Sequence, residues 1–210
     1  EAGIDHGLVA TESEATAHAI DLLHLTLARS DLPALALALQ AWHEGRGERA
    51  LAVNAWLTRT RESAELALQA QQMGRSLLEW LRGIDPDAAS RWEAAVRGVQ
   101  PAPVPTYVSL YALAACACAA SARTVLRAYA FGWCENLMQA ALKAVPLGQM
   151  AGQRMLVALM AQIPAAIDDA LARAGRADFA DDLPSLLAYS PGQAILSARH
   201  ETQYSRLFRS

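Results

Sequence analysis

Residues 142–154, LKAVPLGQMAGQR, join two long alanine-rich segments through a Pro-Leu-Gly turn. Good helix formers dominate both segments, so the stretch predicts two consecutive helices, over about 121–144 and 147–174. Residues four apart share a helix face, which would put Gly148 above Gly152 and Gln149 above Gln153. Paired glycines let another backbone approach closely, and the amides form a polar strip beside them. The stretch therefore predicts a contact surface, with an ordinary helix–loop–helix connector as the alternative.

The composition of the whole chain is that of an all-α protein. Alanine and leucine dominate the 210 residues, aromatic residues make up 6%, and runs of Val, Ile and Thr are absent. We expect a single-domain bundle of about eight to ten helices over residues 1–210, with a proline-rich internal joint at 100–105 and a C-terminal tail at 200–210. No helical period recurs, which counts against a solenoid. Helices rich in alanine leave apolar surface that a second copy can cover, so we also expect a dimer.

Local start and stop signals set the expected helix boundaries. Thr11 and Glu14 form a capping-box pattern, and the helix that they start should run to about residue 29. Residues 48–82 predict one long helix, bent at Gly74 and closed by Gly83. The other expected features are a helix start at Asp31 with Pro33, a short helix opened by residues 85–87, a helix over about 106–119, an interruption near Pro164, an acidic loop over 178–182, and short helices opened by Pro184 and Pro191.

The residue types that carry catalysis or bind metals are not arranged for either task. No two of the five histidines stand four residues apart; they are His6, His18, His24, His43 and His200. Cys116 and Cys118 would point about 200° apart on a helix, so they cannot chelate one ion, and Cys134 has no nearby histidine. Phosphate-binding and nucleophile motifs are absent. We therefore expect no enzyme, no cofactor and no metal site.

Charge and cysteine content restrict the partners and the compartment. The net charge of −3 is too small to indicate binding to nucleic acid or to an anionic membrane. No uninterrupted apolar run reaches the ~18 residues of a membrane span. Three cysteines do not suggest a disulfide framework, so we expect reduced thiols and a cytoplasmic protein.

Two features remain as candidates for partner binding. Lys143 is the only lysine in the chain, at the expected C-terminal end of a helix, where a cation is also favoured electrostatically without any binding role. The tail combines aromatic residues and arginines, which are enriched at binding hot spots, although a frayed terminus is the alternative. The candidate partner-binding residues are Lys143, Pro146, Gly148, Gln149, Gly152, Gln153, Arg154, Tyr204, Arg206, Phe208 and Arg209.

Three separate blocks of the sequence resemble the UreF family of urease accessory proteins. The run from Lys143 to Arg154 is similar to that family's Lys-x-Val-Pro-Leu-Gly-Gln-x-x-Gly-Gln-Arg signature. Residues 128–136 resemble its Ala-Tyr-x-x-x-Trp-x-Glu-Asn helix, and residues 204–210 resemble its closing Tyr-x-Arg-Leu-Phe-x-Ser; residues 72–76 fit a fourth, weaker block. The family's Gly-Gly-rich N-terminal segment would end where this chain starts, at Glu1, so no role is assigned to it here.

The resemblance implies a function that the composition alone does not. It implies a cytoplasmic, dimeric factor for urease maturation that binds the UreD/UreH-type accessory protein and the UreG-type GTPase. Together these proteins would deliver nickel to the urease apoprotein, with the metal and the nucleotide held by the partners. Two rival functions remain open from the residues alone. One is an all-helical enzyme whose metal site is assembled from scattered groups such as Glu62, Glu65 and the Asp168-Asp169 pair; the other is a general helical scaffold.

Overall fold

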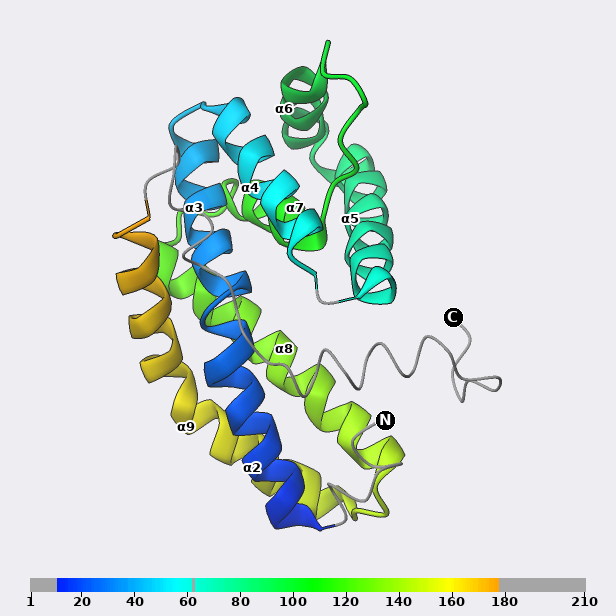
Figure 1. The fold of residues 1–210 in the computed structure, drawn as a ribbon, viewed down its shortest axis with the longest axis vertical. Helices are drawn as coiled ribbons and strands as arrows, with labels where there is room; N and C mark the ends of the chain where they lie inside the picture. The colour runs from blue at the N-terminus through cyan, green and yellow to red at the C-terminus, as the bar shows by residue number, and fades with distance from the viewer. Residues whose placement is uncertain (1–10, 62, 178–210) are drawn as a thin grey trace.

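The expectation of an all-α fold is confirmed by the computed structural model, which describes residues 11–61 and 63–177. Those residues form eight α-helices and one π-helical segment, with no strand among them (Figure 1). The helices are α2 (Glu12–Leu22), α3 (Asp31–His43), α4 (Gly47–Arg59), α5 (Ala64–Ile84), α6 (Pro86–Val96), α7 (Tyr107–Ala115), α8 (Ala122–Ala144) and α9 (Gln149–Ala174); the π-helical segment η1 (Leu23–Leu27) extends α2.

Helix α3 connects two groups of helices. In Figure 1 helices α2, α8 and α9 run together through the lower part of the molecule, whereas α4, α5, α6 and α7 gather in the upper part. Helix α3 contacts α4 and α7 of the upper group and α8 and α9 of the lower group. Its sequence alternates leucine and alanine, and almost all of its residues from Leu32 to Trp42 are buried. A helix that is apolar all round is stable only when other helices surround it, which is the position that α3 occupies.

Several helices begin where side chains satisfy their free N–H groups. The Thr11 Oγ1 accepts a hydrogen bond from the Glu14 N–H at 3.3 Å, and the Glu14 Oε2 accepts one from the Thr11 N–H at 3.0 Å. This confirms the predicted capping box. The Asp85 carboxylate likewise accepts from the Ala88 N–H at 3.1 Å at the start of α6, which confirms that helix as well.

The prediction of one long helix over residues 48–82 is wrong. Helix α4 ends at Arg59, and α5 begins after Ser63, whose hydroxyl accepts a hydrogen bond from the Leu66 N–H at 3.2 Å. Gly83 does not close the helix either, because α5 continues to Ile84. Good helix formers fill this stretch, so the sequence pattern hides a break that Ser63 makes by capping a new helix.

Gly74 serves a close approach between two chain segments, and α5 continues past it without a break. A Cβ atom at Gly74 would lie 2.2 Å from the Pro105 carbonyl oxygen. The proline-rich segment is held there by the buried Asn54, whose Nδ2 donates to the Val104 carbonyl at 2.9 Å and whose Oδ1 accepts from the Thr106 N–H at 2.8 Å. The expected break at 100–105 is therefore present and is packed against α5.

Helix α9 runs without interruption through Pro164, contrary to expectation. Pro164 and Met160 are both exposed, so the carbonyl that loses its N–H partner lies on the solvent side, where water can replace it.

Helix α9 is also long and apolar enough to cross a membrane by length and composition, and the bent pair of α2–η1 and α3 passes the same test together. Within the described residues α9 packs on α2, α3 and α8, as a bundle helix does.

Candidate partner-binding surface

The predicted contact segment forms the turn of a helical hairpin at the lower end of the molecule. Helix α8 ends at Ala144, α9 begins at Gln149, and α2 begins beside them (Figure 1). Lys143 is exposed in the last turn of α8, where the partial negative charge of the helix end favours a cation. Val145 is buried and fixes the turn, whereas Pro146 is exposed. The turn therefore presents the lysine and the proline on its outer side.

The two glycines of the segment do not form the smooth strip that the sequence predicted. Gly148 is the N-cap residue of α9, outside the helix, with open space around the position of a Cβ atom. Gly152 is buried, and a Cβ atom there would lie 2.8 Å from Leu142 Cδ1. Because α8 folds back onto α9, Gly152 serves the contact between these two helices and is not offered to a partner.

The polar residues of the segment divide into an exposed set and one paired residue. Gln149 and Gln153 are both exposed near the start of α9. Arg154 makes a two-pronged ion pair with Glu12, in which its Nε and Nη2 donate to the two carboxylate oxygens at 2.7 Å each. The hydrogen bonds and charge of this pair lower the pKa of Glu12 and raise that of Arg154. Arg154 therefore links the start of α9 to the start of α2.

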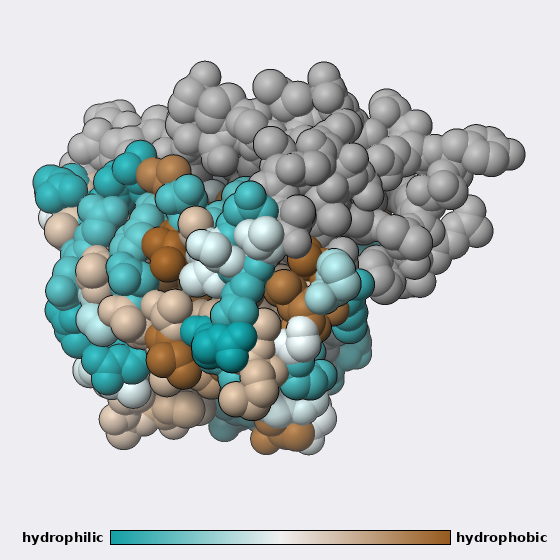
Figure 2. Space-filling view, turned by 90° about the horizontal axis from the view of Figure 1, so that it is seen from below, coloured by the Kyte–Doolittle hydropathy of each residue, from teal (hydrophilic) through white to brown (hydrophobic). Residues whose placement is uncertain are grey.

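Apolar side chains lie near these polar ones. Met150 and Val157 are among the most exposed large hydrophobic residues of the described chain, and both belong to α9. Figure 2, which views the molecule from its lower end, shows brown apolar side chains in separate patches between teal hydrophilic ones. A surface that mixes apolar and hydrogen-bonding groups is typical of protein interfaces. Met150 and Val157 were missed by the sequence analysis, because only the packing of α8 on α9 decides which face of α9 stays open.

The described candidates for a metal site do not form one. Within residues 11–61 and 63–177 no group of three or more His, Cys, Asp or Glu side chains could hold an ion. Asp168 pairs with Arg123 at 2.6 Å and Asp169 with Arg173 at 2.8 Å, so both carboxylates lie in ion pairs. Glu62 lies outside the described residues. The described part of the chain gives the metal-enzyme alternative no site.

The cysteines show no activation. Cys134 is fully buried, and this burial raises the pKa of its thiol to about 11, which keeps it protonated and unreactive near neutral pH. Cys116 is half-buried and Cys118 is exposed, and both are free thiols. Burial raises the pKa of Cys116 as well.

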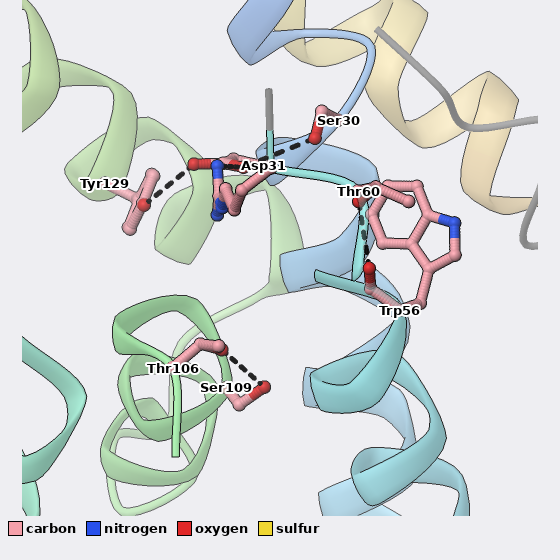
Figure 3. A network of polar contacts seen from close by, with 8 residues as sticks. Ser30, Asp31, Trp56, Thr60, Thr106, Ser109 and Tyr129 are labelled. Carbon is pink, nitrogen blue, oxygen red and sulfur yellow. Dashed lines mark hydrogen bonds and ion pairs between the residues drawn. The ribbon is translucent and has the colours of Figure 1, made fainter. Parts of the chain in front are cut away.

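A polar network at the start of α3 was also missed. The Asp31 carboxylate faces the Arg61 guanidinium at 2.9 Å, and their side chains are only 15% and 18% exposed. The Tyr129 hydroxyl donates to Asp31 at 3.5 Å, and Ser30 donates to it at 3.4 Å (Figure 3). Burial, and then the Asp31 charge, raise the pKa of Tyr129 well above its ordinary value. Tyr129 belongs to the Ala-Tyr-x-x-x-Trp block of α8, so that tyrosine joins α8 to α3 inside the fold.

The tail candidates cannot be placed in the same way. Tyr204, Arg206, Phe208 and Arg209 lie outside the described residues, as do the expected acidic loop over 178–182 and the helices expected after Pro184 and Pro191.

Comparisons with known proteins agree over the length of the chain. A family model described as UreF matches residues 9–160. The urease accessory protein UreF of Methylibium petroleiphilum is 50% identical over 214 residues, which cover 100% of this chain and 84% of the relative. The urease accessory protein UreF of a Polaromonas species is 49% identical over 210 residues, with the same coverage of 100% and 84%. A bifunctional urease accessory protein UreEF of Bordetella bronchiseptica is 43% identical over 213 residues; these cover 100% of this chain and 46% of that longer protein.

Proposed function

Because this chain belongs to the UreF family of urease accessory proteins, which act in urease maturation and are not enzymes, we propose that it works by binding other maturation proteins. Its partners are the UreD/UreH-type accessory protein, the UreG-type GTPase and the urease apoprotein. It regulates the GTP-dependent delivery of nickel to urease, while the metal and the nucleotide stay with the partners. The relative that joins UreE and UreF in one polypeptide supports a place among such proteins.

The observation that carries this proposal is the exposed turn between α8 and α9. Lys143, Gln149 and Gln153 are exposed there, and no carboxylate among the described residues forms an ion pair with Lys143. Exposed charges and amides beside apolar side chains supply directional hydrogen bonds as well as area to a partner. We assign this turn to the GTPase, whose turnover it controls.

The C-terminal tail is the second binding element of the proposal. Residues 204–210 combine Tyr204, Arg206, Phe208 and Arg209 in seven positions. Aromatic residues and arginines dominate the energetics of most interfaces, so we assign this tail to the UreD/UreH-type protein.

A pull-down with purified partners tests both assignments. Deleting residues 204–210 should leave the helical bundle folded, as judged by its circular dichroism and melting temperature, but should abolish capture of the UreD/UreH-type protein. A matched control deletes no residue and replaces Arg97, an exposed arginine at the end of α6, with alanine. Equal capture by the truncated and full-length chains would exclude the tail, and failure of the full-length chain to capture either partner would exclude the proposed function.

We also propose that the protein acts as a homodimer in the cytoplasm. The three cysteines are all free, in keeping with a reducing compartment. A bundle with this many exposed apolar side chains gains by covering some of them, and a two-fold dimer is the commonest closed arrangement.

A further inference from the structure

A groove lies where the end of α9, the end of α3 and the start of α8 meet. In Figure 1 the orange end of α9 lies beside α3, far from the α8–α9 turn. The groove has a volume of about 460 Å³, which is within the usual size of a binding site. Its apolar lining consists of Ala36, Leu39, Ala122, Leu171 and Ala174.

The floor of the groove belongs to the core of the bundle. Leu39 is 1% exposed, and Leu171 and Ala174 pack partly buried against the same core. The polar residues of the lining are exposed, and one of them, Gln40, donates from its Nε2 to the Glu44 Oε1 at 2.9 Å. The floor carries no charge and no hydrogen-bonding side chain, so it suits an apolar occupant.

The chain itself provides a segment that starts beside this groove. Gly175, the C-cap residue of α9, lines the groove, and the described residues end at Ala177. Only residues 178–182 then separate Ala177 from Leu183. Five residues span up to about 17 Å when extended, which lets the next part of the sequence turn back to the groove.

That next part, residues 183–189, has the pattern of a short amphipathic helix; we call it the leucine segment. Leu183, Leu186 and Leu187 stand three and four residues apart and therefore share one helix face, while Ser185 points about 200° from Leu183. Pro184 is favoured in the first turn of a helix. Three leucines on one face need a cover, and an apolar helix face laid into a groove is a common way to provide it.

We infer that the leucine segment docks as a short helix in the groove of its own chain. A short linker gives a tethered segment an effective concentration of the order of millimolar, so it should outcompete the segment of a second copy at micromolar protein. Residues 190–203 would then connect this anchor to the C-terminal tail. The inference goes beyond the proposed function, because neither the GTPase nor the UreD/UreH-type protein takes part in the docking.

Hydrogen exchange of the full chain, read by mass spectrometry without partners, measures whether the leucine segment is docked. The amides of residues 185–189 should exchange at least about tenfold more slowly in the wild type than in Leu186→Glu/Leu187→Glu, because docking protects helical N–H groups. The protection should be the same at two protein concentrations, since the contact lies within one chain.

A larger side chain in the groove tests where the leucine segment docks. Ala122 is exposed at the first position of α8, so Ala122→Trp should fill the groove, leave the bundle folded and remove the protection of residues 185–189. Ala172→Trp is the matched control, because Ala172 is an exposed alanine of α9 that does not line the groove. It should keep the protection. Thermal melts should show that both variants remain folded.

Three results would overturn the inference. Wild-type amides of residues 185–189 that exchange as fast as those of the double leucine variant would show that the leucine segment is not docked. Protection that survives Ala122→Trp would place the leucine segment elsewhere. Protection that grows with protein concentration, or that arises only when the UreD/UreH-type protein is added, would give the leucine segment to a second copy or to that partner.

Discussion

Replacement of Gly74 by alanine should destabilise the protein, although alanine is the better helix former. Gly74 lies inside α5, where the higher helix propensity of alanine alone would stabilise the fold by about 1 kcal/mol. The added Cβ atom, however, would lie 2.2 Å from the Pro105 oxygen and 2.7 Å from its carbonyl carbon. Both are backbone atoms, so no side chain can rotate away to relieve the overlap.

The magnitude follows from what must move. Forcing a methyl group into a filled site typically costs about 1–3 kcal/mol. If residues 104–106 shift to make room, the hydrogen bonds that Asn54 makes to Val104 and Thr106 weaken as well, and each is worth about 1 kcal/mol. After the gain in helix propensity we expect a net loss of roughly 2–4 kcal/mol, or a fall in melting temperature of roughly 5–15 °C.

Gly83→Ala provides the control within the same helix. A Cβ atom at Gly83 would meet nothing within 4 Å, so only the propensity effect remains. This variant should be stabilised by up to about 1 kcal/mol. Urea unfolding followed by circular dichroism at 222 nm compares the two variants. If Gly74→Ala is as stable as the wild type, the close approach of α5 to the proline-rich segment is wrong.

Two further substitutions test the buried polar network. Asp31→Asn removes the charge facing Arg61 and should lower the free energy of unfolding, measured by urea titration, by roughly 1–3 kcal/mol. Tyr129→Phe loses only a 3.5 Å hydrogen bond to Asp31 and should lower it by less than about 1 kcal/mol. For the thiols, a maleimide reagent at pH 7 should label Cys118 rapidly and Cys134 only after unfolding, as read by mass spectrometry; labelling of Cys134 in the native protein would contradict its burial. Burial raises the pKa of Cys134 from 9.0 to about 11, so its contribution to stability is complete below pH 9 and is lost as the pH rises toward 11. The loss of stability over this range, measured by urea unfolding at several pH values, should be smaller in Cys134→Ala.

The parts of the fold that could be predicted from sequence are those with local causes. The capping box of Thr11 and Glu14 and the start of α6 at Asp85 depend on residues within one helical turn, and both were predicted correctly. The break between α4 and α5 was missed, although Ser63 is a good cap residue, because the flanking residues are equally good helix formers. The interruption predicted near Pro164 is absent, because the effect of a proline inside a helix depends on whether the carbonyl that it leaves without a partner reaches water.

The parts that failed depend on contacts between distant segments. The sequence predicted a helix bend at Gly74, but the role of Gly74 is set by its contact with Pro105, 31 positions further along the chain. Arg154 was assigned to a partner from its motif, and this assignment stays a prediction; its ion pair with Glu12, which bridges 142 positions, could not be foreseen from the sequence. The sequence located the turn that carries Lys143, yet only the packing of α8 on α9 separates the exposed residues there from the buried Gly152.

The central claim is that the α8–α9 turn controls a partner and does not hold this fold together. Lys143→Ala tests this claim most directly when melting temperature, GTP turnover by the GTPase and urease activation are all measured on one preparation. Two controls accompany it: Lys143→Arg retains the charge, and Arg97→Ala removes another exposed basic residue. Because Lys143 is an exposed surface charge, its removal should change stability by no more than about 0.5 kcal/mol. Loss of a central interface residue typically costs about 2 kcal/mol or more, roughly a thirtyfold effect on binding. We predict that Lys143→Ala melts like the wild type but alters GTP turnover and urease activation, while Arg97→Ala changes neither. Normal activation by Lys143→Ala, or an activation defect accompanied by unfolding, would contradict the account.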